Sequence, residues 1–215
     1  MIKTKLILTA LLSIITVQLI AQDAKAKQIL DELSDKTRKY TTITSDFDFT
    51  LDDKAADVHQ TQEGLLKMKG SRYYIKLGEN HIYSDGETRW TYNEDMQEVY
   101  IDHAESGDDA LNPTEIYTVW ESGFKHYYDK EITENGKTYH VIKLNPTDPE
   151  EKPFHTVKLY VDKAKMEVAK IEILGKQGDD YIYSVNSFKP DISYDAGTFK
   201  FDMAENPGVV VIDNR

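Results

Sequence analysis

Residues 83–93 have the sequence Tyr-Ser-Asp-Gly-Glu-Thr-Arg-Trp-Thr-Tyr-Asn, and this stretch decides the predicted fold. Asp85-Gly86 predicts a two-residue type I′ turn, because such a turn requires positive φ at both central positions. Trp90 and Tyr92 are two residues apart on the outgoing arm, so their rings lie on one face of the predicted strand. The stretch therefore predicts a β-hairpin with an aromatic face, for which an ordinary sheet core is the simplest interpretation.

Alternating apolar residues continue on both sides of this hairpin. Phe47 and Phe49 alternate with acidic residues within 43–51, which is typical of a strand with one buried face. Further segments of this kind, separated by turn signals, are 64–69, 72–77, 97–101, 127–132, 137–144, 155–161, 166–174, 181–188 and 198–203. Their succession predicts an antiparallel meander of about 11 strands and not βαβ units.

Two helices are expected beside the strands. The first spans 24–40, where apolar residues recur at helical spacing opposite charged ones. The second begins at Asn112, a capping residue followed by Pro113, and ends at Gly123. We therefore expect a mainly β (α+β) fold, in which one curved antiparallel sheet forms an incomplete barrel and the helices cover its apolar face. Periodicity leaves open whether side chains fill the enclosed space.

Composition narrows the classes of function. The chain has 215 residues, which fits one domain, and a formal net charge of −12, which opposes binding to nucleic acid or to an anionic membrane surface. It contains no cysteine, so disulfides and thiolate metal sites are excluded.

The N-terminus has the features of a secretory signal peptide. Lys3 and Lys5 precede an apolar run that ends near Ala21, and the chain then becomes polar. We expect cleavage after Ala21, a signal peptide over 1–21, and a mature domain over 22–215.

No catalytic or metal-binding motif is visible. The six histidines are scattered, and the chain contains no G-x-S-x-G, P-loop or G-x-G-x-x-G motif. We therefore expect neither an enzyme nor a bound cofactor or metal, although pairs of carboxylates brought together only by folding would be invisible in the sequence.

The chain resembles the periplasmic outer-membrane lipoprotein carrier family, the LolA-like proteins. The matching segments, in order, are the signal peptide, the amphipathic first helix, the strand ending Phe47-Asp48-Phe49, the segment 64–69, the hairpin 84–93, and the ending Phe199-Lys200-Phe201 with Pro207-Gly208-Val209. The resemblance covers nearly the whole mature chain, and the hairpin is its most specific part. It implies an incomplete β-barrel with a helical lid over a hydrophobic cavity.

The resemblance also suggests site residues. The expected cavity lining is Phe47, Phe49, Leu66, Met68, Tyr73, Ile75, Trp90 and Tyr92, and the expected lid residues are Ile116, Tyr117 and Trp120. Family members often carry an arginine after the strand that matches 64–69, where it tethers the lid. This chain has Gly70 there, which makes Arg72 the nearest candidate for a lid latch.

Three hypotheses about function follow. The first is a monomeric periplasmic carrier that takes acylated lipoproteins from an inner-membrane ABC transporter to an outer-membrane acceptor. The second is a binding or sensor module of the same fold that recognises another lipid or a protein partner. The third is a hydrolase of carbohydrate or lipid with carboxylate chemistry, which no motif in the sequence supports.

Overall fold

The computed structural model describes residues 23–104 and 119–215, and these form a mainly β fold with one α-helix, over residues 23–37. The strands are β1 (Ile43–Asp53), β2 (Val58–Lys69), β3 (Arg72–Leu77), β4 (Asn80–Ser84), β5 (Thr88–Asn93), β6 (Glu98–His103), β7 (Phe124–Glu134), β8 (Lys137–Pro146), β9 (Phe154–Asp162), β10 (Glu167–Gly175), β11 (Asp179–Pro190) and β12 (Val210–Asp213). Three short 3-10 helices are η1 (Val119–Glu121), η2 (Pro149–Glu151) and η3 (Ala196–Phe199).

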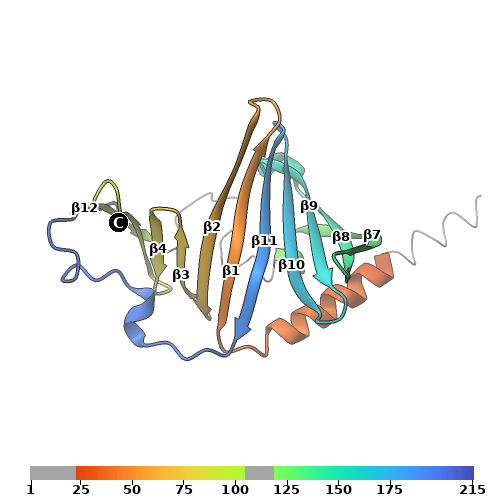
Figure 1. Ribbon diagram of the computed structural model, residues 1–215, viewed down its shortest axis with the longest axis horizontal. Helices are drawn as coiled ribbons and strands as arrows, with labels where there is room; N and C mark the ends of the chain where they lie inside the picture. The colour runs from red at the N-terminus through yellow and green to blue at the C-terminus, as the bar shows by residue number, and fades with distance from the viewer. Residues whose placement is uncertain (1–22, 105–118) are drawn as a thin grey trace, which may run out of the picture.

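These strands form one sheet in the order β12-β6-β5-β4-β3-β2-β1-β11-β10-β9-β8-β7. Neighbouring strands are antiparallel, except that β12 is parallel to β6. β1 pairs with β2 on one side and with β11 on the other, so it joins the two halves of the chain. The sheet is long, curved and open, with β12 and β7 as its edges (Figure 1). The predicted incomplete antiparallel barrel is confirmed, and β12 is an additional strand.

The hairpin at Asp85-Gly86 has a longer loop than the predicted two-residue turn. β4 ends at Ser84 and β5 begins at Thr88, which leaves three loop residues. Asp85 Oδ1 accepts hydrogen bonds from the backbone N–H groups of Glu87 and Thr88 at 3.1 and 3.0 Å. The aspartate side chain therefore satisfies the loop amides, and Gly86, at φ 97°, supplies the left-handed conformation.

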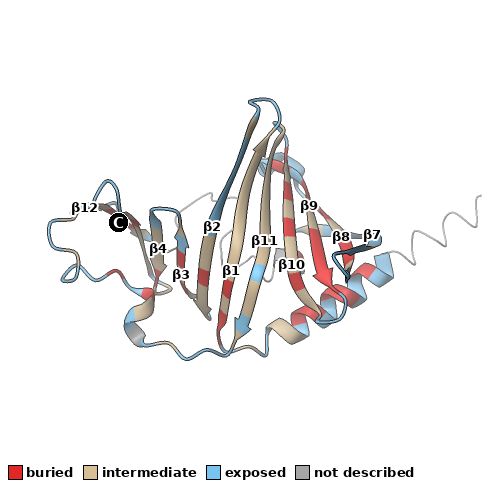
Figure 2. Cartoon of the chain, in the orientation of Figure 1, coloured by how far each residue is buried: buried red, intermediate tan, exposed pale blue. Residues whose placement is uncertain are grey.

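The helix packs on one face of the sheet, which we call the helix face. Its residues Ala26, Ile29, Leu30 and Leu33 are buried, which confirms the predicted amphipathic pattern. The sheet residues in the same core include Ile142, Leu144, Val157, Leu159, Val161, Ile171 and Ile173. Figure 2 shows buried residues along the helix and along β8, β9 and β10. The core of the protein thus lies between the helix and the second half of the sheet.

The C-terminal segment, residues 191–209, covers part of the opposite face. The Phe201 ring centroid lies 5.0 Å from that of Tyr92, and the Arg72 guanidinium carbon lies 5.7 Å from the Phe199 ring centroid. The predicted strand over 198–203 is wrong, because Phe199 belongs to η3 and Phe201 follows it outside any strand. Both phenylalanines are buried against this face instead of alternating along a strand.

Several predicted features lie outside the described residues. They are the signal peptide over 1–21 with its cleavage after Ala21, the start of the second helix at Asn112, and the lid residues Ile116 and Tyr117. In the part of the chain that the structure describes, the helices are too short or too polar to cross a bilayer.

Candidate functional site

Four aromatic side chains form a layer on the helix face at the centre of the sheet. The aromatic layer consists of Phe47 and Phe49 from β1 and Tyr181 and Tyr183 from β11. The Phe49 ring centroid lies 5.0 Å from that of Tyr183 and 6.2 Å from that of Tyr181, and the Phe47 and Tyr183 centroids are 6.0 Å apart. All four rings are only partly buried. They form an apolar surface along the central strand pair that is open to further contacts.

A small apolar gap adjoins this layer. Its volume is about 30 Å³, and it is lined by Ser45, Phe47, Leu66, Val168, Ile171, Tyr183 and Val185. Ser45 is 1% exposed, and its Oγ has no hydrogen-bond partner. Ligand pockets for small molecules usually measure about 300–1,000 Å³. The gap therefore holds a ligand only if the surrounding side chains move apart.

Gly64 determines where one wall of this gap lies. It is opposite Phe47 in the β1–β2 pair. A Cβ at Gly64 would lie 2.3 Å from Phe47 Cζ and 2.5 Å from Cε2. The ring therefore lies directly over the glycine backbone, in space that any other residue would occupy.

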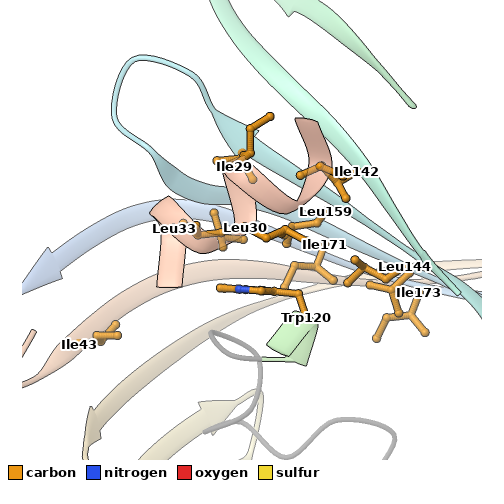
Figure 3. Packing of buried hydrophobic residues seen from close by; sticks show 14 of the residues in the cluster. Ile29, Leu30, Leu33, Ile43, Trp120, Ile142, Leu144, Leu159, Ile171 and Ile173 are labelled. Atoms are coloured by element: carbon orange, nitrogen blue, oxygen red, sulfur yellow. The ribbon is translucent and has the colours of Figure 1, made fainter. Parts of the chain in front are cut away.

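Trp120 connects the helix to the chain that precedes β7. Its Nε1 donates a buried hydrogen bond of 2.8 Å to Ser34 Oγ, and its ring is 1% exposed. Arg38 and Glu121 form an ion pair of 2.7 Å next to it. We call these two contacts the Trp120 clasp. Figure 3 shows Trp120 among the buried side chains of the core, near Leu33 of the helix. The clasp therefore fixes the helix over the sheet.

The strand register divides the eight predicted lining residues between the two faces. Phe47, Phe49, Leu66, Met68, Tyr73 and Ile75 share the helix face. Trp90 and Tyr92 lie on the opposite face. Residues paired across neighbouring strands share a face, and Trp90 pairs with Tyr83, which in turn pairs with Tyr74. Tyr74 is next to Tyr73 in β3 and therefore points away from the helix face. Phe201 covers Tyr92 there. The aromatic surface of the hairpin thus belongs to a second, smaller core.

The candidate latch residue also lies on the opposite face. Arg72 precedes Tyr73 in β3, so its side chain points away from the helix and toward the Phe199 ring. Gly70 is a turn residue with φ 60°, and a Cβ there would meet nothing within 4 Å. Neither residue lies on the helix face. The helix is held there by its buried apolar residues, by the Trp120 clasp and by an ion pair of 2.9 Å between Lys36 and Glu167.

The electrostatics of the site are those of an apolar surface with a polar rim. The hydroxyl of Tyr181 donates a hydrogen bond of 2.8 Å to Asp179 Oδ2, and this bond, with partial burial, raises the pKa of Tyr181. The described residues contain no group of three His, Asp or Glu side chains that could hold a metal ion. Among the described residues, Ser45 Oγ has no hydrogen-bond partner, so no base is positioned there to activate it as a nucleophile.

Sequence reasoning missed several residues of the site. Tyr181 and Tyr183 are on a strand that it predicted, and their spacing of two is visible in the sequence. Their position in the layer depends on the pairing of β1 with β11, which joins residues about 140 positions apart, such as Asp46 and Ser187. The sequence did not indicate that Ser45 is buried, because serine is common at exposed strand positions.

Solved structures from several bacteria are similar to this one. An uncharacterized conserved protein from Thermus thermophilus has a TM-score of 0.58 and 12% identity, covering 88% of this chain and 99% of its own. LprF from Mycobacterium bovis has a TM-score of 0.51 and 8% identity, with coverages of 79% and 95%. The LolA superfamily protein NE2245 from Nitrosomonas europaea has a TM-score of 0.43 and 11% identity, with coverages of 82% and 97%. At these identities the first two matches show a shared fold.

A match to the sequence model of a protein family shows the family to which the chain belongs. A comparison with curated proteins finds no match. The model of the outer membrane lipoprotein carrier protein LolA matches residues 38–202, which extend from the end of the helix through β1–β11 to Asp202 and leave out β12. This span contains the aromatic layer, the gap and the Trp120 clasp except for Ser34. The chain therefore belongs to the family of the outer membrane lipoprotein carrier protein LolA.

Proposed function

We propose that this protein is a periplasmic carrier, which binds the acyl chains of lipoproteins between the helix face and the helix and moves them from the inner to the outer membrane. The observation that carries the proposal is the aromatic layer, which adjoins an apolar gap on the same face of the sheet as the helix. Membership of the lipoprotein carrier family supports acylated lipoprotein as the cargo.

The physical need for such a container is large. An acyl chain in water costs about 0.8 kcal/mol per exposed CH₂ group, so crossing an aqueous compartment requires an apolar surface around the chain. Delivery also requires that the surface release its cargo. A gap of about 30 Å³ fits this requirement, because a site this small leaves little apolar surface uncovered once the cargo has left.

The Trp120 clasp is suited to open during loading. Its buried hydrogen bond contributes about 0.5–1.5 kcal/mol, as neutral pairs do. Its ion pair contributes about 0–1 kcal/mol, since Arg38 is 63% exposed. Both values are small beside the gain from covering several CH₂ groups, so the clasp itself is a minor barrier to loading. The larger cost of moving the helix is the exposure of Ile29, Leu30 and Leu33, which an incoming acyl chain offsets by covering the same apolar core.

The remaining parts of the proposal concern place and partners. The segment 1–21 directs the chain to the periplasm and leaves 22–215 as the mature carrier domain. An inner-membrane ABC lipoprotein-release transporter supplies the cargo, and an outer-membrane acceptor receives it from the monomeric carrier. No chemical step is part of this function, so the protein is not an enzyme and needs no cofactor.

A second candidate function is a lipid sensor built on the same fold. The observation in its favour is that Gly70 is a turn residue and that Arg72 lies 5.7 Å from the Phe199 ring on the opposite face, away from the helix. A protein that holds its helix differently can report lipid binding to a partner instead of delivering the lipid.

Photocrosslinking tests the proposed site. The mature protein is incubated with a photoactivatable palmitoyl probe, irradiated and digested, and the labelled peptides are identified by mass spectrometry. We expect labels on the β1 and β11 peptides that contain the aromatic layer, and weaker labelling in Phe49→Asp. The matched control is Tyr74→Asp in β3, which changes an aromatic residue on the opposite face. Labels confined to the opposite face, or none, would contradict the site.

A transfer assay separates the carrier from the sensor. Protein loaded with an acylated peptide is mixed with outer-membrane vesicles, and the vesicle-bound peptide is measured. Transfer supports the carrier, whereas retention of the peptide with capture of a stoichiometric protein partner supports the sensor.

A further inference from the structure

One polar group that lines the gap has no hydrogen-bond partner. Ser45 is on the helix face of β1, two residues before Phe47, and its Oγ is buried without a hydrogen-bond partner. The other residues around the gap are Phe47, Leu66, Val168, Ile171, Tyr183 and Val185. An unpaired buried hydroxyl destabilises the empty protein, so alanine at this position would suit the core better.

A water molecule does not account for this serine. Buried waters typically make about 3 hydrogen bonds to polar groups, whereas the gap is lined almost entirely by hydrocarbon and aromatic atoms. The hydroxyl instead fits a ligand with one hydrogen-bond acceptor attached to an apolar chain. A carbonyl oxygen next to an acyl chain is such a group, and a serine O–H can donate to it.

We propose that Ser45 is a binding residue that donates a hydrogen bond to the ester or amide carbonyl of a bound acyl group. The inference rests on the proposed function and adds the position of the carbonyl. Phe47 and Phe49 follow Ser45 at alternate positions of β1, so an acyl chain held at Ser45 extends along the aromatic layer. Ligands with an ester-linked acyl group and ligands with an amide-linked acyl group both carry this carbonyl, so an ester probe and an amide probe are needed to distinguish them.

Three probes of similar length test this proposal: methyl palmitate, N-methylpalmitamide and heptadecane, which has no oxygen. Each is delivered from cyclodextrin to the mature protein, and its affinity is measured by displacement of 1-anilinonaphthalene-8-sulfonate. The variants are Ser45→Ala and the matched control Ser184→Ala, which is in β11 on the opposite face, at the position paired with Asp48.

We expect Ser45→Ala to weaken binding of a carbonyl probe about three- to tenfold, the effect of one neutral hydrogen bond, and to leave heptadecane binding unchanged. A loss confined to the amide would identify an N-acyl source, and a loss confined to the ester would identify a glyceride source. We also expect Ser45→Ala to raise the Tm of the empty protein by about 2–4 °C, because it removes the unpaired hydroxyl. Ser184→Ala should leave the affinities unchanged.

The outcomes that overturn the inference are distinct from failure of the proposed function. Two results with wild-type protein that binds all three probes would show that Ser45 does not bind the carbonyl. In the first, Ser45→Ala has the same affinity for every probe as the wild type. In the second, Ser45→Ala loses as much affinity for heptadecane as for the carbonyl probes. If wild-type protein binds none of the probes, the proposed function fails, and the inference fails with it.

Discussion

The substitution Gly64→Ala should force the Phe47 ring out of its position over β2. The new Cβ would lie 2.3, 2.5 and 2.8 Å from three atoms of that ring, all below ordinary contact distance. Moving the ring by about 1 Å or more disturbs its contact with Tyr183 and narrows the gap that it lines. Overpacking of this kind costs about 1–3 kcal/mol, so we expect the free energy of unfolding to fall by that amount. Acyl-probe affinity should fall as well.

A double-mutant cycle with Phe47→Leu isolates this clash. The smaller leucine leaves room for a Cβ, and alanine in a strand is favoured over glycine by about 0.5–1 kcal/mol through the unfolded chain. Gly64→Ala should therefore be neutral or stabilising in the Phe47→Leu background, with a coupling energy of about 1–4 kcal/mol. Urea denaturation of the four proteins measures it. A coupling energy near zero would refute the packing of Phe47 on Gly64.

Three further predictions address the clasp, the opposite face and pH. Ser34→Ala removes the acceptor of the Trp120 indole, so the free energy of unfolding in urea should fall by about 1–3 kcal/mol while acyl-probe affinity rises; an unchanged affinity would argue against clasp opening. Arg72→Ala should change probe affinity by less than about twofold, since Arg72 contacts Phe199 on the opposite face, and a tenfold loss would contradict the register. Burial and nearby Lys25 lower the pKa of His140, so as the pH falls the unfolded chain binds a proton at this histidine before the folded protein does. The free energy of unfolding should therefore fall as the pH drops below about 6.5, and His140→Gln should lessen that fall. An identical pH dependence in both proteins would exclude this histidine as its source.

Local patterns predicted the elements of this fold well. The alternation around Phe47 and Phe49 predicted a strand, which is β1 in the structure. The helical spacing of Ile29, Leu30 and Leu33 identified the buried side of the helix. Both patterns depend on neighbours within a few positions, which the sequence displays directly. Strand succession and turn signals were enough to predict an antiparallel meander.

The site depended on contacts that local patterns do not contain. Tyr183 joins Phe49 only because β1 pairs with β11, and that register is set by packing across the whole chain. Trp90 and Tyr92 have the same alternation as the residues of the helix face, so their assignment to the opposite face became visible only with the pairing of β3, β4 and β5. Phe201 was predicted to be in a strand because its spacing from Phe199 is two, although both rings pack against a sheet face from outside any strand.

The central claim is that the helix face holds acyl chains, and native mass spectrometry tests it most directly. The mature protein is purified from a Gram-negative periplasm, sprayed under native conditions, and then extracted with organic solvent to identify any bound molecule. The account predicts a co-purifying acylated lipid or lipoprotein, or uptake of an added palmitoyl probe at one per chain, with both signals reduced in Phe49→Asp and retained in Tyr74→Asp. Protein that is empty on purification and also takes up no added acyl probe would contradict the account.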